Sequence, residues 1–390
     1  MHGVPFERRA PARVGLIGAG GRGQFLLGEL RACEGVQLAA VADARQEMIE
    51  ALKPKLADDP PAYYTGANCG QKLLEHDLDL VIVATSWETH TPLALEVMEA
   101  GKHAAVEVPA AVTLEECWQL VETSERTRRH CIMLENCCYG YWEMLVKRMC
   151  AAGLLGSLTH AECAYIHNLR SYLLQYQQWR RQAHIRSNRN LYPTHGLGPV
   201  AQCFDIGGED AFDYLVSMSS REAGLSEYRA RHIPADDPRQ QEGYVCGDMN
   251  VSLIRTRQGR TIVLQHDVVT PRPYDRIFLV SGTKGTFRDY PPRLYLDEAS
   301  QSEEEWLNVD NYRAAWEDPL WKEQGEQAIR LGGHGGMDYL MLYRLMQTMH
   351  AGLPPEMDVY DAADWSAPGP LSEQSVARRS AAVDFPVFRR

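Results

Sequence analysis

The chain has 390 residues, of which 45% are hydrophobic, and it carries a formal net charge of −12 at pH 7. This length is typical of two domains with sizeable cores, and the acidic charge argues against nucleic acid as a partner. No apolar run is long enough for a membrane span, and residues 1–13 lack the apolar core of a signal peptide, so we expect a cytoplasmic protein without a membrane partner. The ten cysteines show neither C-x-x-C nor Cys/His zinc spacing, which predicts reduced thiols and no metal site.

The chain opens with a strand, a glycine-rich turn and a helix. Residues 14–17 are apolar, and Gly18, Gly20 and Gly23 follow at the spacing G-x-G-x-x-G. In a dinucleotide-binding loop the first glycine permits a tight turn, the second lets the backbone approach a pyrophosphate, and the third lets the helix pack closely on the strand. The expected helix, residues 22–32, points its positive end at phosphates. The alternative is a glycine-rich turn without a ligand.

Asp43 favours the dinucleotide interpretation. It ends a second apolar run, residues 36–42, and lies 20 residues after Gly23. An acid at this point accepts hydrogen bonds from the adenosine ribose, and its charge repels a 2′-phosphate. The sequence therefore predicts NAD rather than NADP, although the nearby Arg45 would suit a 2′-phosphate.

Residues 13–138 alternate strand and helix patterns, which predicts a doubly wound parallel sheet with helices on both faces. Ligands of such a sheet bind beyond the carboxyl ends of its strands. Polar residues follow the strands expected at 80–85, 104–107 and 131–134, and residues 87–90 are expected to form a loop before a helix whose first turn holds Pro92. The residues expected at these strand ends are Trp87, His90, Glu107, Val108 and Asn136. The alternative is that they only cap helices or face solvent.

The pattern changes after about residue 139. Strands predominate from there, which predicts an α+β domain with a mostly antiparallel open sheet. The expected strands are residues 158–167, 214–218, 249–256, 261–268 and 276–281. Residues 221–243 and 297–330 are polar and read as irregular surface segments, and a late helix is expected over 337–350. An exposed face of this sheet would suit a homo-oligomer.

The stretch from Asn190 to Pro199 is the densest group of polar and aromatic residues. It predicts a constrained loop before a helix at 200–205. A histidine with a pKa near 6.5 can accept and donate a proton at neutral pH, which makes His195 a candidate acid or base beside Tyr192. The alternative is that His195 caps its helix.

Other residues of the second half suit a polar ligand. Tyr165 and Arg180 could bind sugar hydroxyls or an amide, although residues 179–181 also read as a solvated helix face. Tyr274 lies on a connection stiffened by prolines. The glycine-rich stretch 332–336 indicates a loop over a ligand, and the sequence assigns no role to its His334.

Several stretches resemble the Gfo/Idh/MocA oxidoreductases and, over nearly the whole chain, glycoside hydrolase family 109. The matching stretches are residues 107–111, 134–139, 190–200, 265–267, 271–274, 333–338 and 357–363. The resemblance implies a Rossmann NAD-binding domain over residues 1–138 and an α+β substrate-binding and catalytic domain over residues 139–390. It also implies the activity of an NAD-dependent α-N-acetylgalactosaminidase.

The family pattern further implies roles for individual residues. Cofactor contacts are implied at Gly21, Arg22, Asp43, Trp87, His90, Glu107, Val108, Asn136 and Tyr192. Substrate contacts are implied at Tyr165, Arg180, Tyr192, Pro193, Thr194, His195 and Tyr274. Sugar dehydrogenases of the wider superfamily carry Glu-Lys-Pro, with the lysine in proton transfer, but this chain has Val108 at the lysine position. An aliphatic side chain cannot move a proton, and the glycosidase family shares this valine.

The implied reaction is a retaining hydrolysis of a terminal α-linked N-acetylgalactosamine on a glycoside or glycan. A hydride passes from C3 of the sugar to NAD⁺, a base removes the proton on C2, and the C1 substituent is expelled. Water then adds and the hydride returns, so that no net oxidation occurs; NAD-dependent glycosidases depart from the usual two-carboxylate mechanism. We expect His195 to transfer the proton, with Tyr192 or Tyr165 as the next choice. The alternatives are a sugar dehydrogenase that releases a 3-keto product and a binding protein that holds its cofactor without catalysis.

Overall fold

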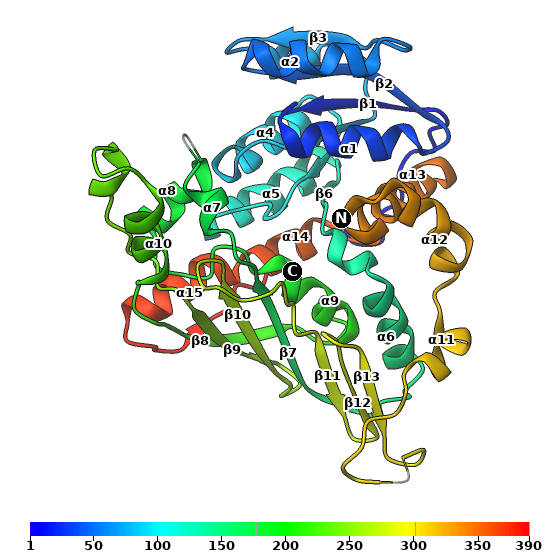
Figure 1. Cartoon of the computed structure of the whole chain (residues 1–390). Coiled ribbons are helices and arrows are strands. Elements are labelled where there is room, and N and C mark those ends of the chain that lie inside the picture. Colours follow the sequence, from blue (N-terminus) through cyan, green and yellow to red (C-terminus); the bar gives the residue numbers. More distant parts are fainter. Residues whose placement is uncertain (176–177, 301, 390) are drawn as a thin grey trace. The chain divides into compact units, whose positions relative to one another are not determined.

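The computed structural model of the chain describes residues 1–175, 178–300 and 302–389 (Figure 1). These residues form two compact units. The first contains Met1–Gly140, Pro319–Ser366 and the chain end from Phe388, and the second contains Tyr141–Asp318 and Ala367–Val387. The predicted domain boundary after residue 138 lies close to Gly140, the residue after which the chain first passes from the first unit to the second. The expected continuous second domain differs from these units over Pro319–Ser366, where the chain returns to the first unit.

The first unit is built on a six-stranded sheet in the order β3-β2-β1-β4-β5-β6, and all of its strand pairs are parallel. Its strands are β1 (Ala12–Ile17), β2 (Val36–Asp43), β3 (Ala62–Thr65), β4 (Leu80–Val83), β5 (His103–Val106) and β6 (Cys131–Met133). This order confirms the predicted doubly wound sheet. Only β3 has no counterpart in the prediction. It is a short, half-buried edge strand, so its sequence shows no clear alternation.

Helices cover this sheet and bring the late part of the chain to it. They are α1 (Gly21–Arg31), α2 (Gln46–Leu52), α3 (Cys69–Leu74), α4 (Trp87–Glu99), α5 (Leu114–Thr127), α12 (Pro319–Leu331), α13 (Met337–Ala351) and α14 (Val359–Ser366), with 3-10 turns at Lys53–Leu56, Asn136–Tyr139 and Gly333–Gly336. α13 contacts α1 and β1, and α14 contacts α5 and β6. α13 buries residues on several faces, including Leu340, Met341 and Leu345, and therefore needs more than one apolar neighbour.

Two local predictions for this unit have clear outcomes. Thr113 and Glu116 form the predicted capping box at the start of α5, with the backbone N–H of Glu116 donating to the Thr113 hydroxyl. The expected loop at residues 87–90 is wrong, because these residues form the first turn of α4 and Pro92 lies inside the helix. The extended backbone of Ser86 starts the helix one turn before the proline.

The second unit contains an eight-stranded sheet in the order β13-β12-β11-β7-β10-β9-β8-β14. Its strands are β7 (Leu158–Ile166), β8 (Phe212–Ser219), β9 (Asn250–Thr256), β10 (Thr261–Asp267), β11 (Leu279–Gly282), β12 (Gly285–Arg288), β13 (Arg293–Leu296) and β14 (Val383–Asp384). Among these strands the β7–β10 pair is parallel and the other pairs are antiparallel, which confirms a mostly antiparallel sheet.

Helices pack on one part of this second sheet and leave apolar side chains exposed elsewhere. The helices of the unit are α6 (Tyr141–Ala151), α7 (Arg170–Leu173), α8 (Trp179–Arg186), α9 (Thr194–Cys203), α10 (Gly224–His232), α11 (Asp310–Trp316) and α15 (Pro368–Ala377), with a 3-10 turn at Pro238–Gln241. α9 lies against β7 and α15 against β8 (Figure 1). Met218 on β8 and Leu253 on β9 are exposed.

Three regions predicted to be irregular contain helices in the structure. Residues 194–199 of the expected loop belong to α9, which begins at Thr194 rather than at residue 200 and contains Pro199. The polar segment 221–243 contains α10, and the segment 297–330 contains α11 and most of α12. α12 buries Leu320, Trp321 and Ala328, a narrow apolar stripe that its many polar residues conceal in the sequence. Among the described residues, no helix is both long and apolar enough to cross a membrane.

Candidate functional site

The glycine loop between β1 and α1 has the geometry that its spacing predicts. Gly18 has φ +100°, and a Cβ there would lie 2.5 Å from the carbonyl oxygen of Ala84. A Cβ on Gly23 would lie 1.8 Å from the carbonyl oxygen of Gly18, so only glycine lets α1 approach the loop this closely. By contrast, a Cβ on Gly21 would meet nothing within 4 Å, and one on Gly20 would meet only the Arg45 guanidinium at 3.5 Å. The loop is therefore tight on its inner side and open at Gly20 and Gly21.

Asp43, the last residue of β2, is buried and shapes this loop. One carboxylate oxygen accepts a hydrogen bond from the backbone N–H of Ala19 at 2.8 Å, and the other accepts one from Arg45 at 2.9 Å. The Arg45 side chain also pairs with Asp43, with Nε 3.5 Å from Oδ1. The charge of Arg45, the residue that would suit a 2′-phosphate, is thus partly balanced by Asp43.

Arg22, in the first turn of α1, is held by two carboxylates. Its Nε donates to Glu107 Oε1 at 2.7 Å, and its Nη2 donates to Asp338 Oδ1 at 2.7 Å. The same Asp338 oxygen accepts a hydrogen bond from Asn136 Nδ2 at 2.9 Å. Three predicted cofactor residues from separate parts of the first unit, Arg22, Glu107 and Asn136, are therefore joined in one network.

Electrostatics keeps this network charged. Burial favours the neutral form of Asp338, but hydrogen bonds from His334 and Arg22 hold its pKa below the ordinary value of an aspartate. Burial also opposes the charge on Arg22, yet the negative charges of Glu107 and Asp338 raise its pKa. Glu29, buried on α1, lies near Asp338, and burial followed by that charge raises its pKa. Asp338 was not among the predicted site residues. The only signal for it in the sequence is its position shortly after the glycine-rich stretch 332–336.

The other predicted cofactor residues of the first unit lie at the ends of β4, β5 and β6, whereas Tyr192 lies in the second unit. The imidazole of His90 lies between the carbonyl oxygens of Pro109, 2.8 Å from Nδ1, and Thr85, 3.2 Å from Nε2. It therefore ties the first turn of α4 to the turn after β5. Val108 in that turn is buried, as is Trp87 at the start of α4.

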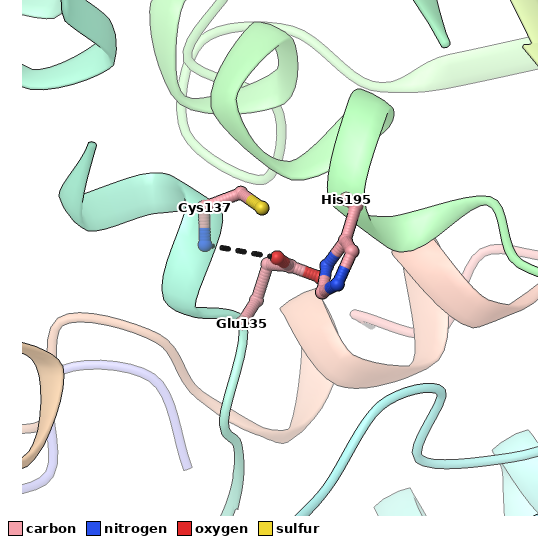
Figure 2. Close-up of side chains that lie close together, drawn as sticks. All are labelled: Glu135, Cys137 and His195. Atoms are coloured by element: carbon pink, nitrogen blue, oxygen red, sulfur yellow. Dashed lines mark hydrogen bonds between the residues drawn. The ribbon is translucent and has the colours of Figure 1, made fainter. Parts of the chain in front are cut away.

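Asn136 begins the 3-10 turn after β6, and Glu135 fixes this turn. The backbone N–H of Cys137 donates to Glu135 Oε1 at 3.1 Å, as Figure 2 shows. Glu135 is fully buried and was not predicted as a site residue. Glu135 is the N-cap of this turn, but glutamate is not one of the usual N-cap residues, so the sequence carries no clear signal for it.

The second unit gathers the predicted catalytic residues in an aromatic cluster. The ring centroids of Tyr192 and His195 lie 4.7 Å apart, and those of Tyr165 lie 4.8 Å from Tyr192 and 5.3 Å from His195. A Cβ on Gly196 would lie 2.8 Å from the backbone nitrogen of Ala164, so this glycine lets α9 approach β7 and bring His195 to Tyr165. Pro193 occupies the N-cap of α9, and His195 lies inside the first turn, where it is not the capping residue.

The predicted substrate residues surround this cluster. Tyr274 contacts Tyr165 with ring centroids 6.2 Å apart, and the Arg180 guanidinium lies 5.3 Å from the centroid of Tyr192. Thr194 is fully buried, and its hydroxyl has no hydrogen-bond partner among the residues that the structure describes. The alternative of a solvated helix face at 179–181 is wrong for Arg181, which is buried and donates to the carbonyl oxygens of residues before α8.

Two histidines of this unit were not predicted as site residues. The Tyr165 hydroxyl lies 3.3 Å from His167 Nδ1, and His167 also contacts Tyr274. His167 follows Tyr165 by two residues, a strand periodicity that could have identified it. His266 on β10 is paired with Tyr165 in register, and burial, followed by the nearby His184, lowers the pKa of His266 to about 3. His266 is therefore neutral.

A buried ion pair fixes the hydroxyl of Tyr274. Arg276 donates to the Glu143 carboxylate, and both side chains are buried. Arg276 Nη1 also donates to the Tyr274 hydroxyl at 3.2 Å. Nearby, burial raises the pKa of Asp289 to about 6. Glu143 lies 133 positions before Arg276, so no local motif indicates this ion pair.

Comparison with known proteins gives two family matches, one in each half of the chain. Residues 12–134 match the family described as "Oxidoreductase family, NAD-binding Rossmann fold", and residues 139–390 match "Glycosyl hydrolase 109, C-terminal domain". A glycosyl hydrolase family 109 protein of Solibacter usitatus is 54% identical over 400 residues, which cover 100% of this chain and 91% of that protein. A family 109 protein of Saccharopolyspora erythraea is 49% identical, with 100% of this chain and 86% of that protein covered.

Solved structures show the same fold. Levoglucosan dehydrogenase in complex with NADH and levoglucosan matches with a TM-score of 0.75 at 18% identity, covering 96% of this chain and 99% of that chain. At this identity the likeness concerns the fold alone. The N-terminal match identifies an NAD-binding Rossmann domain, and the cofactor is NAD. Because the C-terminal family covers more than half of the chain and the curated relatives match along its full length, the chain belongs to glycosyl hydrolase family 109.

Proposed function

We propose that this protein is a retaining exo-glycosidase that uses NAD to hydrolyse terminal α-linked N-acetylgalactosamine. The observation that carries the proposal is Val108. It occupies the position at which the related sugar dehydrogenases carry their proton-transferring lysine, and it is buried between Glu107 and Pro109. Because its side chain cannot move a proton, the reaction must draw its acid and base from elsewhere in the chain.

The geometry of the first unit fits NAD. Gly20, the N-cap of α1, provides no side-chain hydrogen bond to the first turn, so N–H groups of α1 remain for an anion. The open side of Gly20 and Gly21 admits a pyrophosphate. Bound NAD supplies reversible hydride transfer at a substrate carbon. The contacts that we propose in this unit are Gly18, Gly20, Gly21, Arg22, Gly23, Asp43, Trp87, His90, Glu107, Val108 and Asn136.

We assign proton transfer to His195, with Tyr192 and Tyr165 as its partners. The three rings are in mutual contact, so the cluster brings one imidazole, which can accept a proton from the sugar, next to two phenol hydroxyls, which can donate or relay one. The Tyr165 hydroxyl has His167 as a hydrogen-bonding neighbour, which gives this phenol a route for proton exchange. Acid–base catalysis of this kind contributes about 10²–10⁴-fold to a rate.

Sugar binding is proposed for the surrounding residues of the second unit. Arg180 offers donors beside the Tyr192 ring, and Tyr274 offers a hydroxyl that Arg276 fixes. Thr194 offers a buried hydroxyl that needs a partner. The aromatic rings of Tyr165, Tyr192 and Tyr274 supply apolar surface for a sugar ring and exclude water from it.

Stoichiometry tests the proposal. The full chain is incubated with p-nitrophenyl α-N-acetylgalactosaminide and less NAD⁺ than substrate, and nitrophenol and NADH are followed together. We expect many nitrophenol molecules per NAD⁺ and no accumulation of NADH. The p-nitrophenyl β-anomer and the α-glucoside serve as substrate controls. Absence of nitrophenol release would contradict the proposal.

The fold likeness to levoglucosan dehydrogenase favours one second candidate, a sugar dehydrogenase that releases an oxidised sugar. This enzyme would form one NADH for each sugar consumed and would stop when NAD⁺ is exhausted. NADH formation equal to product, measured by absorbance at saturating sugar, would therefore establish the second candidate and exclude the glycosidase.

A further inference from the structure

We propose that Asp338 is a positioning residue for NAD, because its carboxylate holds the side chains of Arg22 and Asn136 in the orientation in which they contact the dinucleotide. The inference deepens the proposed function and rests on the proposed cofactor contacts of these two residues. Asp338 itself is fully buried.

The carboxylate of Asp338 is shared among three side chains. Oδ1 accepts hydrogen bonds from Arg22 Nη2 at 2.7 Å and from Asn136 Nδ2 at 2.9 Å, and Oδ2 lies 2.5 Å from His334 Nδ1. One oxygen thus fixes the distance between a guanidinium from α1 and an amide from the turn after β6. Removing its charge would release both side chains at once.

The orientation of Arg22 points to a role beyond stability. Its Nε is used by Glu107 and its Nη2 by Asp338, whereas Nη1 has no hydrogen-bond partner among the described residues. A buried guanidinium nitrogen without a partner costs free energy unless another acceptor arrives. The two carboxylates therefore fix Arg22 so that its Nη1 can still donate to a phosphate or ribose oxygen.

The glycine-rich stretch 332–336 brings His334 to the carboxylate of Asp338. The expected loop forms a 3-10 turn over Gly333–Gly336 with Gly332 as its N-cap, and Gly332, Gly335 and Gly336 have positive φ angles. His334 also has a positive φ, +46°, which is unfavourable for a residue with a Cβ. The turn places the His334 imidazole against Asp338 and so orients the second oxygen of the carboxylate.

NAD binding by the nucleotide-free full-length protein tests the inference. The Kd for NAD⁺ is measured by calorimetric titration for the wild type and for Asp338→Asn, which keeps the shape of the side chain and removes its charge. We expect the Kd to rise about tenfold to a hundredfold, the range that a charge-assisted hydrogen bond contributes. Tighter binding would mean that Asp338 competes with the dinucleotide for Arg22 and would overturn the inference.

Asp358→Asn is the matched control. Asp358 is buried in the same unit, lies at the start of α14 and pairs with a histidine, His2, and an arginine, Arg389. Its replacement also removes a buried charge, but one whose ion-pair partners are His2 and Arg389 rather than proposed cofactor contacts. We expect a comparable loss in melting temperature for both variants but an unchanged Kd for Asp358→Asn. Equal increases in Kd would reduce Asp338 to a purely structural residue and overturn the inference.

A double-mutant cycle shows whether Asp338 acts through Arg22. Asp338→Asn should weaken NAD binding much less in an Arg22→Ala background than in the wild type, whereas a general loss of structure would add to the effect of Arg22→Ala. If Arg22→Ala and Asn136→Ala weaken NAD binding but Asp338→Asn does not, the inference fails and the cofactor contacts stand. If neither alanine variant changes the Kd, the proposed cofactor contacts fail and the inference fails with them.

Discussion

The Asp43 carboxylate has two structural hydrogen bonds in addition to its proposed contact with the ribose, so its replacement should change stability and nucleotide binding together. Asp43→Ala removes the acceptors of the backbone N–H groups of Ala19 and Arg45. Hydrogen bonds to a charged group contribute about 1.5–3 kcal/mol each, and water can replace part of this at the loop surface. We therefore expect a loss of about 3 kcal/mol in the free energy of unfolding, which lowers the melting temperature by roughly 6–12 °C in a unit of this size.

Asp43→Ala should also weaken nucleotide binding. Loss of the ribose contact raises the Kd for NAD⁺ about tenfold to a hundredfold. The Kd for NADP⁺ should rise less, because the repulsion of the 2′-phosphate disappears at the same time. Asp43→Asn keeps an acceptor oxygen, so it should lose less stability than Asp43→Ala while losing the same charge-based preference for NAD.

The assay combines thermal unfolding of the nucleotide-free protein with titration of NAD⁺ and NADP⁺. Asp79→Ala is the control, because Asp79 also accepts a backbone N–H, that of Arg13 at 2.8 Å, and pairs with an arginine, Arg9. Asp79 precedes β4, at the opposite end of the strands from the glycine loop. The Asp79→Ala variant should have a lower melting temperature and unchanged Kd values for NAD⁺ and NADP⁺. An Asp43→Ala variant with wild-type stability and wild-type nucleotide preference would refute the reasoning.

Three further predictions concern catalysis, the buried ion pair and pH. His195→Ala should lower glycoside turnover about 10²–10⁴-fold, and single-turnover traces should show NADH without matching aglycone release; equal loss of both would contradict its role in proton transfer at C2. Arg276→Met leaves the Glu143 charge buried without its ion-pair partner and should cost about 3–5 kcal/mol in urea unfolding, whereas adding Glu143→Leu should restore stability but not the KM for the sugar. Burial lowers the pKa of His103 to about 3 and that of His130 to about 4, so below pH 6.5 only the unfolded chain binds these protons. The free energy of unfolding should therefore fall as the pH drops from 6.5 towards 4, by roughly 1.4 kcal/mol per pH unit for each histidine, and His103→Gln should flatten this slope in urea titrations.

The features that the sequence predicted well are those determined within a few residues. The positive φ of Gly18 and the close approach at Gly23 follow from the lack of a Cβ, which a spacing motif records directly. The capping box of Thr113 and Glu116 is likewise complete within four positions. Most of the parallel sheet could be predicted because β1, β2, β4, β5 and β6 each contain a short, buried apolar run between polar turns, whereas the half-buried β3 does not.

The errors arose where local signals compete. Pro92 suggested a helix start, but a helix that begins at Trp87 contains this proline as its sixth residue and loses one backbone hydrogen bond. Pro199 and the two glycines before it likewise suggested that the helix starts after His195. In the structure α9 begins at Thr194 and contains Pro199. Both segments are buried by tertiary packing, which outweighs the helix propensity of single residues.

The site network shows most clearly why sequence reasoning stops short of a complete site. Arg22 and Asp338 are 316 positions apart, and nothing in the neighbourhood of either residue indicates the other. What the sequence does carry is a late helix that is apolar on several faces, and such a helix must pack against an existing core. Once α13 packs on α1, the carboxylate in its first turn is carried into the dinucleotide-binding unit, and there it stays charged because a cation pairs with it. Because Arg22 provides that cation, its orientation is determined by a segment that a division of the chain at residue 138 assigns to the other domain.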